Sequence, residues 1–117
     1  MRMWMITPSK MCRKHLLGEH VEISMFSGSI RKGVSIEGYV RNNLLEVSSL
    51  KKRHDEISEE MVRRGYNHKT DFTEKEQSDC LNLISETYKN YKIDKEKSLS
   101  DLLARCPECC GRISNGN

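Results

Sequence analysis

The spacing of the apolar residues between positions 44 and 67 restricts the fold more than any other feature of the chain. Leu50, Ile57, Met61 and Val62 recur there at intervals that form one apolar face of an α-helix, and Gly65 follows at a typical helix end. Nowhere does the chain alternate apolar and polar residues in the way that predicts a β-strand. The pattern therefore predicts an all-α protein.

Capping signals predict two further helices. Thr7 with Pro8 indicates a helix that starts at this point and ends within residues 24–28. Thr73 indicates another, because Glu76 follows it at the capping-box spacing.

The remaining segments complete the expected architecture. Residues 27–43 contain three glycines and predict a loop with room for one helical turn, and a last short helix is expected over 98–105. We expect a compact single-domain helical bundle over residues 1–105, followed by a cysteine-containing C-terminal tail over residues 106–117.

Composition limits the classes of protein to which the chain can belong. Its 117 residues are enough for one domain, and no run of eighteen apolar residues or signal-peptide pattern is present. We therefore expect an intracellular protein with no membrane partner, in the cytoplasm, or in the nucleus or viral factory for a virus-encoded chain. The net charge of +3 and the clustered basic residues permit a nucleic-acid partner but are more typical of solvated helix faces.

A stripe of titratable residues runs along the predicted first helix. His15, Glu19 and Glu22 lie within about 60° of one another on a helix, and Cys12 extends the same stripe. A di-iron or manganese site is disfavoured, since a di-iron site needs matching carboxylates and histidines from further helices. The stripe is then either a hydrogen-bonded structural network or the place of a catalytic carboxylate.

Five cysteines in an intracellular chain argue against a disulfide framework. Cys106 and Cys109 have the C-x-x-C spacing of zinc sites, with Cys110 adjacent. A structural zinc site needs a second pair of ligands, for which the chain offers only scattered candidates: Cys12, Cys80, His54 and His68. We expect no metal and no cofactor, and interpret the C-terminal cysteines as free, partly exposed thiols.

Several short segments follow one another in a characteristic order: an arginine directly after the first residue, then HLLGEHVEI, SGSIRK and LKKRHDEISEEMVRRGYNHK. In this order they resemble the phage endonuclease V family, whose members are pyrimidine dimer DNA glycosylases with an associated abasic-site lyase. The resemblance covers most of residues 1–70, with a weaker similarity near 99–107. It implies a compact all-α domain whose N-terminal segment packs between helices, which fits the presence of Trp4 so close to the start.

The resemblance also implies a mechanism. The nucleophile would be the backbone amine of the mature N-terminal residue, which forms an imine with the anomeric carbon of the damaged nucleotide. In general, the free-base fraction at neutral pH is roughly 400-fold greater for an α-amine than for a lysine side chain. Met1 occupies this position, and we expect it to be retained because Arg2 follows it. Glu22 matches the family's catalytic glutamate, which assists sugar-ring opening and proton transfer during β-elimination.

Four basic residues match DNA-binding positions of the family. Arg2 would hold DNA at the active site, and Arg31 and Lys32 would lie near phosphates. Lys97 is a looser match to a basic residue beside the active site. The partner is then double-stranded damaged DNA, and we expect a monomeric enzyme.

Departures from the family keep other interpretations open. Val21 and Met25 stand where the phage enzyme has arginines, so the chain could also be a DNA-binding relative with lost or altered catalysis. Tyr88 and Tyr91 could stack on bases or pack within the protein. A zinc-stabilised interaction module is a third alternative.

Overall fold

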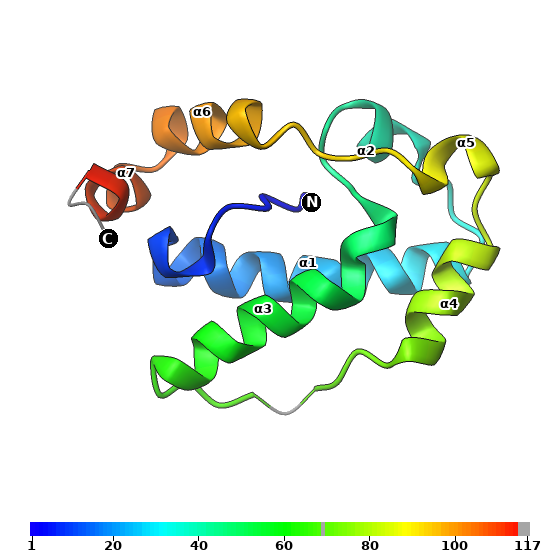
Figure 1. Ribbon diagram of the computed structural model, residues 1–117, viewed down its shortest axis with the longest axis horizontal. Helices are drawn as coiled ribbons and strands as arrows, with labels where there is room; N and C mark the ends of the chain where they lie inside the picture. Colours follow the sequence, from blue (N-terminus) through cyan, green and yellow to red (C-terminus); the bar gives the residue numbers. More distant parts are fainter. Residues whose placement is uncertain (69, 115–117) are drawn as a thin grey trace.

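The computed structural model describes residues 1–68 and 70–114, and these residues form helices and connecting segments without a strand. The predicted all-α fold is therefore confirmed (Figure 1). Within the described part of the chain, none of the helices combines the length and the apolar character needed to cross a membrane. The elements, in chain order, are η1 (Pro8–Lys10), α1 (Arg13–Arg31), α2 (Glu37–Arg41), η2 (Val47–Ser49), α3 (Leu50–Arg63), α4 (Glu74–Asn82), α5 (Glu86–Lys89), α6 (Lys95–Arg105) and α7 (Pro107–Ser114).

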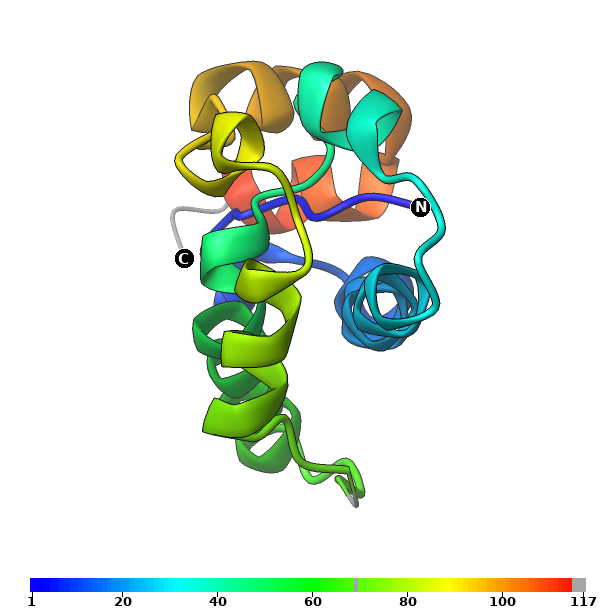
Figure 2. The ribbon, with the colours of Figure 1, turned by 90° about the vertical axis from the view of Figure 1, so that its right-hand side faces the viewer.

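The helices form two layers with the N-terminal segment between them. Helices α1, α3 and α4 lie on one side, and α2, α5 and α6 lie on the other, as both ribbon views show (Figures 1 and 2). The blue N-terminal segment runs through the space between these layers. The expectation that this segment packs between helices is confirmed.

Backbone hydrogen bonds and apolar burial hold the N-terminal segment in place. The N–H of Met3 donates to the carbonyl oxygen of Leu44 at 2.7 Å, and Ser98 Oγ donates to the carbonyl oxygen of Trp4 at 2.5 Å. Met3 and Trp4 are almost fully buried. Burying these side chains removes apolar area from water, which offsets the entropy lost when a chain end is ordered.

The first long helix begins and ends later than its sequence signals predict. Thr7 and Pro8 start only the single turn η1, after which the backbone becomes extended through Cys12, and α1 begins at Arg13. The interruption lets the N–H of Cys12 donate to Cys109 Sγ at 3.2 Å instead of continuing a helix. At the other end α1 continues through residues 24–28 to Arg31, because this buries Ser27 and Ile30 on the core side.

The later helices follow their signals more closely. Thr73 Oγ1 accepts a hydrogen bond from the N–H of Glu76 at 3.1 Å, and Gly65 ends the turn after α3 with a φ of +83°, a conformation that favours glycine. Val62 was predicted to lie on the apolar face of α3, but 63% of its surface is exposed. Val62 is rotated by about 100° from Met61 around the helix axis, so its side chain falls outside the buried face.

A buried ion pair joins α1 to α3. Arg53 donates from Nε to Glu19 Oε2 at 2.6 Å and from Nη2 to Glu19 Oε1 at 3.0 Å, and both side chains are at most 2% exposed. Arg53 Nη2 also contacts Met11 Sδ at 3.3 Å. The pair is bidentate, the geometry in which a buried arginine and carboxylate best satisfy each other.

Removal of Arg53 alone should strongly destabilise the protein. In Arg53→Met, Glu19 remains buried without a partner, which costs about 3–5 kcal/mol in the free energy of unfolding. The double variant Glu19→Leu/Arg53→Met should regain most of this loss because no isolated charge is left. Urea denaturation of the wild type, Arg53→Met and the double variant measures both effects, with the exposed Lys75→Ala as the control. A double variant no more stable than Arg53→Met would contradict the explanation.

Three histidines meet where α1, α3 and the segment after α3 come together. The rings of His20, His54 and His68 have centroids 5.0–5.2 Å apart. His54 Nδ1 lies 3.1 Å from Asp55 Oδ1, and His68 Nε2 lies 2.9 Å from Ser58 Oγ. Burial, together with the charges of His54 and His68, lowers the pKa of His20 to about 4. His20 is therefore neutral at pH 7.

Acid should destabilise the fold through His20. Because its pKa falls from 6.5 to about 4 on folding, the unfolded chain binds a proton that the folded chain does not over this range. Stability should be greatest above pH 6.5 and fall as the pH drops toward 4. We expect a shallower fall in His20→Leu, measured as Tm against pH. Equal slopes for the two proteins would show that His20 does not contribute.

Candidate active site

An open cleft of about 400 Å³ lies between the N-terminal segment and α1. It brings together residues from both ends of the chain, since its lining includes the first residue and the last residue of α6. The residues that line it are Met1, Arg2, Trp4, Lys14, His15, Gly18, Glu19, Glu22, Leu44 and Arg105. Met1 and Glu22, the two predicted catalytic residues, therefore share one cleft.

Glu22 lies directly against the N-terminal backbone. Its Oε2 accepts a hydrogen bond from the N–H of Arg2 at 3.3 Å, so the carboxylate lies next to the peptide bond that links Met1 to Arg2. Glu22 is partly exposed, three residues beyond the buried Glu19 on the same face of α1. The two carboxylates of the predicted stripe thus have different environments: Glu19 is neutralised by Arg53, whereas Glu22 faces the cleft.

The Arg2 side chain is bound by the protein itself. Its guanidinium carbon lies 3.7 Å from the centroid of the Trp4 ring, and its nitrogens donate to Ser98 Oγ at 3.2 Å and Asp101 Oδ2 at 3.4 Å. Burial lowers the pKa of Arg2, although Asp101 opposes this effect. Burial alone would raise the pKa of Asp101, but Arg2 and Lys97 outweigh it and lower that pKa. These contacts anchor the N-terminal segment to α6.

Two exposed cations that sequence reasoning did not select line the cleft. They are Lys14, in the first turn of α1, and Arg105, whose guanidinium carbon is 5.4 Å from the centroid of the Trp4 ring. Burial, followed by the charges of Lys14 and Arg105, lowers the pKa of His15. Arg105 lies within residues 99–107, where the sequence already showed a weaker similarity to the family, so the signal for this residue was available.

The other predicted DNA-binding residues lie outside the cleft lining. Arg31 is at the C-terminal end of α1, about 13 Å along the helix axis from Glu22, and pairs with Glu76 at 3.2 Å. Lys32 follows it and is exposed. Lys97 is exposed on α6 and lies 3.5 Å from Asp101 Oδ2, so it is connected to Arg2 through that carboxylate.

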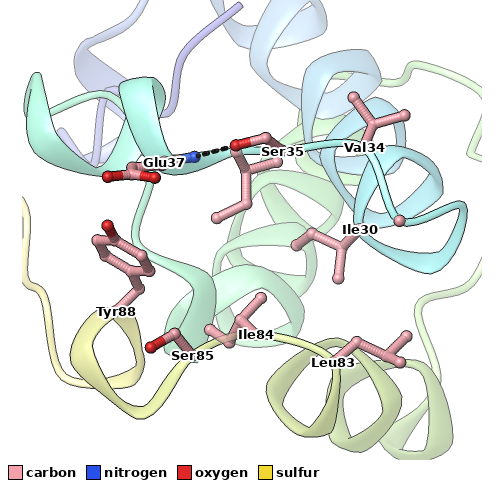
Figure 3. Close-up of a pocket in the computed structure, with 10 residues that line it drawn as sticks. Ile30, Val34, Ser35, Glu37, Leu83, Ile84, Ser85 and Tyr88 are labelled. Atoms are coloured by element: carbon pink, nitrogen blue, oxygen red, sulfur yellow. Dashed lines mark hydrogen bonds between the residues drawn. The ribbon is translucent and has the colours of Figure 1, made fainter.

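A second pocket, of about 190 Å³, lies between the end of α1, α2 and α5 (Figure 3). Ile30, Leu83 and Ile84 give it apolar walls, and it shares no lining residue with the Met1 cleft. Tyr88 faces it and accepts a hydrogen bond from Arg41 at 3.0 Å. Tyr88 and Tyr91 pack edge to face, with centroids 5.7 Å apart. This geometry favours packing over base stacking as their role.

The C-terminal cysteines are not the exposed thiols that the sequence suggested. Cys106 and Cys109 are buried, and only Cys110 is partly exposed. The segment after residue 105 folds into α7 and packs against the start of α1, where Cys109 accepts the hydrogen bond from Cys12 described above. The division of the chain at residue 105 stays a prediction, and residues 115–117 of the expected tail lie outside the described residues.

Donor atoms of Cys12, His15, Cys106 and Cys109 gather at this contact, all within 4.8 Å of one another. We call these four residues the Cys/His cluster. Cys12 was counted among the potential ligands, but His15 was assigned only to the helical stripe. The Cys12-x-x-His15 spacing was the available sequence signal.

Comparison with known proteins assigns the chain to a family. A family model described as pyrimidine dimer DNA glycosylase matches residues 1–74, which include Met1, Glu22 and most of the cleft lining. No curated protein and no solved structure matches the chain. The match covers more than half of the sequence, and it agrees with the ordered segments and with the all-α fold. The chain therefore belongs to the pyrimidine dimer DNA glycosylase family.

Proposed function

We propose that this protein cleaves the glycosidic bond of a damaged pyrimidine in UV-damaged duplex DNA and then cleaves the strand at the resulting abasic site. The observation that carries the proposal is the shared cleft of Met1 and Glu22, with the Glu22 carboxylate hydrogen-bonded to the N–H of Arg2. An amine nucleophile and a carboxylate at one site are the two groups that imine-forming glycosylases need.

The α-amine of Met1 is the proposed nucleophile, with Met1 as the first residue of the mature chain. Its lone pair forms a bond to C1′ of the damaged nucleotide while the glycosidic bond breaks and its electron pair leaves with the base. Glu22 accepts a proton from the Met1 nitrogen after the attack and passes it to the sugar-ring oxygen as the ring opens, while the departing base takes up a proton from solvent. A protonated imine between Met1 and C1′ remains. Removal of a proton from C2′ then drives β-elimination of the 3′ phosphate.

Arg2 has a positioning role in this proposal rather than a direct role on DNA. Its guanidinium is stacked on Trp4 and hydrogen-bonded to α6, so its donors are largely used within the protein. These contacts fix the backbone from which the Met1 amine projects. A nucleophile on an anchored segment needs less ordering before it reacts.

The exposed cations around the cleft suit phosphate binding. Lys14 and Arg105 are the nearest, and we assign Arg31, Lys32 and Lys97 to more distant parts of the DNA backbone. Such contacts would offset the cost of distorting the duplex to expose a stacked nucleotide. The expected monomeric state and intracellular location stay predictions.

Two exposed apolar residues mark where the DNA surface differs from that of the phage enzyme. Val21 and Met25 are 56% and 49% exposed on α1, within about 100° of Glu22 around the helix. No core contact explains their apolar character. We propose that they contact the DNA without binding phosphate, which would change the choice of lesion.

Glu22→Gln should separate chemistry from binding. The amide keeps the size of the side chain and an acceptor for the N–H of Arg2 but cannot transfer a proton at neutral pH, so strand cleavage should fall about 10²- to 10⁴-fold. Affinity for the DNA should change little. The measurement is single-turnover cleavage of duplexes that carry a thymine dimer or an abasic site, together with a binding titration. Glu59→Gln, on the exposed side of α3, is the matched control.

Borohydride reduction of the same reactions tests the nucleophile. Mass spectrometry should locate the reduced cross-link on the Met1 amine. A cross-link to the thymine-dimer duplex indicates glycosylase activity, whereas a cross-link to the abasic-site duplex alone indicates lyase activity only. Full cleavage by Glu22→Gln, or a cross-link on a lysine, would overturn the proposed mechanism. Binding of both DNAs without trapping would instead favour a DNA-binding relative without catalysis.

Arg105→Gln should weaken DNA binding more than Lys97→Gln does, because only Arg105 lines the cleft. Loss of one phosphate contact should reduce the slope of log K against log salt concentration by about 0.9. Fluorescence anisotropy at several salt concentrations measures this slope. Lys75→Gln, a highly exposed site on α4, controls for net charge. Equal effects of all three substitutions would indicate a general charge effect only.

A further inference from the structure

The Cys/His cluster joins two parts of the chain that are far apart in sequence. Cys12 precedes the first turn of α1 and His15 lies within that turn, whereas Cys106 directly follows α6 and Cys109 lies in the first turn of α7. Each part contributes two residues with two residues between them. Two such pairs form the ligand pattern of a structural zinc site.

The distances between the donor atoms fit a tetrahedral metal site. Cys12 Sγ lies 3.8 Å from Cys106 Sγ and 3.3 Å from His15 Nδ1, and Cys109 Sγ lies 3.8 Å from His15 Nδ1. Zinc bonds of ordinary length at tetrahedral angles place two sulfurs about 3.8 Å apart and a sulfur and a nitrogen about 3.6 Å apart. These three distances therefore lie close to the edges of the required tetrahedron, and all four donor atoms are within 4.8 Å of one another.

Backbone N–H groups donate to the sulfur atoms as they do around metal-bound thiolates. The N–H of Cys12 donates to Cys109 Sγ at 3.2 Å, and the N–H of Cys109 lies 3.4 Å from Cys106 Sγ. All three cysteines are at least nine-tenths buried. Such hydrogen bonds orient the ligands and reduce the charge on sulfur, which favours thiolates in a site with little water.

A disulfide accounts for this arrangement less well. One disulfide would join two of the three sulfurs. It would not explain why the third sulfur and the His15 ring nitrogen lie close to the other two sulfurs. The remaining buried cysteine shows the ordinary alternative, because Cys80 packs in the hydrophobic core and, among the described residues, has a hydrogen bond only to Ser27 Oγ, at 3.5 Å. The convergence of four ligand atoms is therefore specific to the Cys/His cluster.

We propose that Cys12, His15, Cys106 and Cys109 bind one zinc ion that links the start of α1 to the junction of α6 and α7. Each cysteine binds as a thiolate, with its proton released to solvent. The ion acts as a structural cross-link in a small helical domain. It also bears on the cleft, because Arg105 immediately precedes a ligand and His15 is itself part of the cleft lining. The inference does not depend on the proposed function.

Elemental analysis of untagged protein, expressed with zinc and purified without a metal-chelating column, tests the proposal. Wild type should carry about one zinc ion per chain. Cys109→Ser should lose the ion, whereas Cys110→Ser, adjacent in sequence but outside the cluster, should keep it. Glu22→Gln should also keep it, so a failed catalytic proposal leaves this result intact.

Cobalt substitution keeps the test decisive where a cysteine variant does not fold. Wild-type protein stripped of metal under reducing conditions and loaded with Co²⁺ should show sulfur-to-cobalt charge-transfer bands and the intense visible bands of a tetrahedral site. The absence of both zinc and these bands would overturn the proposal. Metal retained in Cys109→Ser but lost in His54→Ala would overturn the proposal and place the ion at the three histidines. A Cys12–Cys106 disulfide in freshly purified protein would also overturn it, because two of the ligands would then be oxidised.

Discussion

The buried ion pair between Glu19 and Arg53 is the interaction on which the rest of the structure depends. It crosses the contact between α1 and α3, and neither charge reaches solvent. The bidentate geometry permits only a narrow range of positions for one helix relative to the other. Glu22 lies one turn further along α1, so the same constraint decides where its carboxylate faces. The charge that supports the core and the carboxylate proposed for catalysis are thus neighbours on one helical face.

Burial of the N-terminal segment is the second constraint. A chain end seldom orders without help, but here Met3 and Trp4 occupy the space between the two layers, and Arg2 is bound to α6 through Ser98 and Asp101. The cleft is consequently assembled from distant parts of the chain: the first residues, the first half of α1, Leu44 and the end of α6. A substitution that distorts α6 would therefore displace the proposed nucleophile, although no residue of α6 takes part in the bond-making steps.

The Cys/His cluster makes a comparable connection at the start of α1. It lies where η1, α1, α6 and α7 meet, and Arg112 adds a hydrogen bond to the carbonyl oxygen of Ser9 at 2.7 Å. With a bound ion the junction would be fixed by metal bonds, and the position of Arg105 with it. The proposed chemistry itself needs no metal, so the ion would be part of the fold that presents the cleft.

The sequence by itself determined the helical class, the end of α3, the start of α4 and the end of α6, because these depend on local periodicity and capping residues. Through the ordered segments it also predicted Met1 and Glu22 as partners in one site. It did not predict α7, which forms where a tail was expected. It misjudged the start of α1, since the signal of Thr7 and Pro8 is local while the extended backbone at Cys12 depends on Cys109. Only the tertiary structure decided that Glu19 is neutralised by Arg53, that Arg105 rather than Lys97 lines the cleft, and that His15 meets three cysteines. Each of these depends on contacts between residues 34 to 101 positions apart along the chain, and no pattern within a single helix records such contacts.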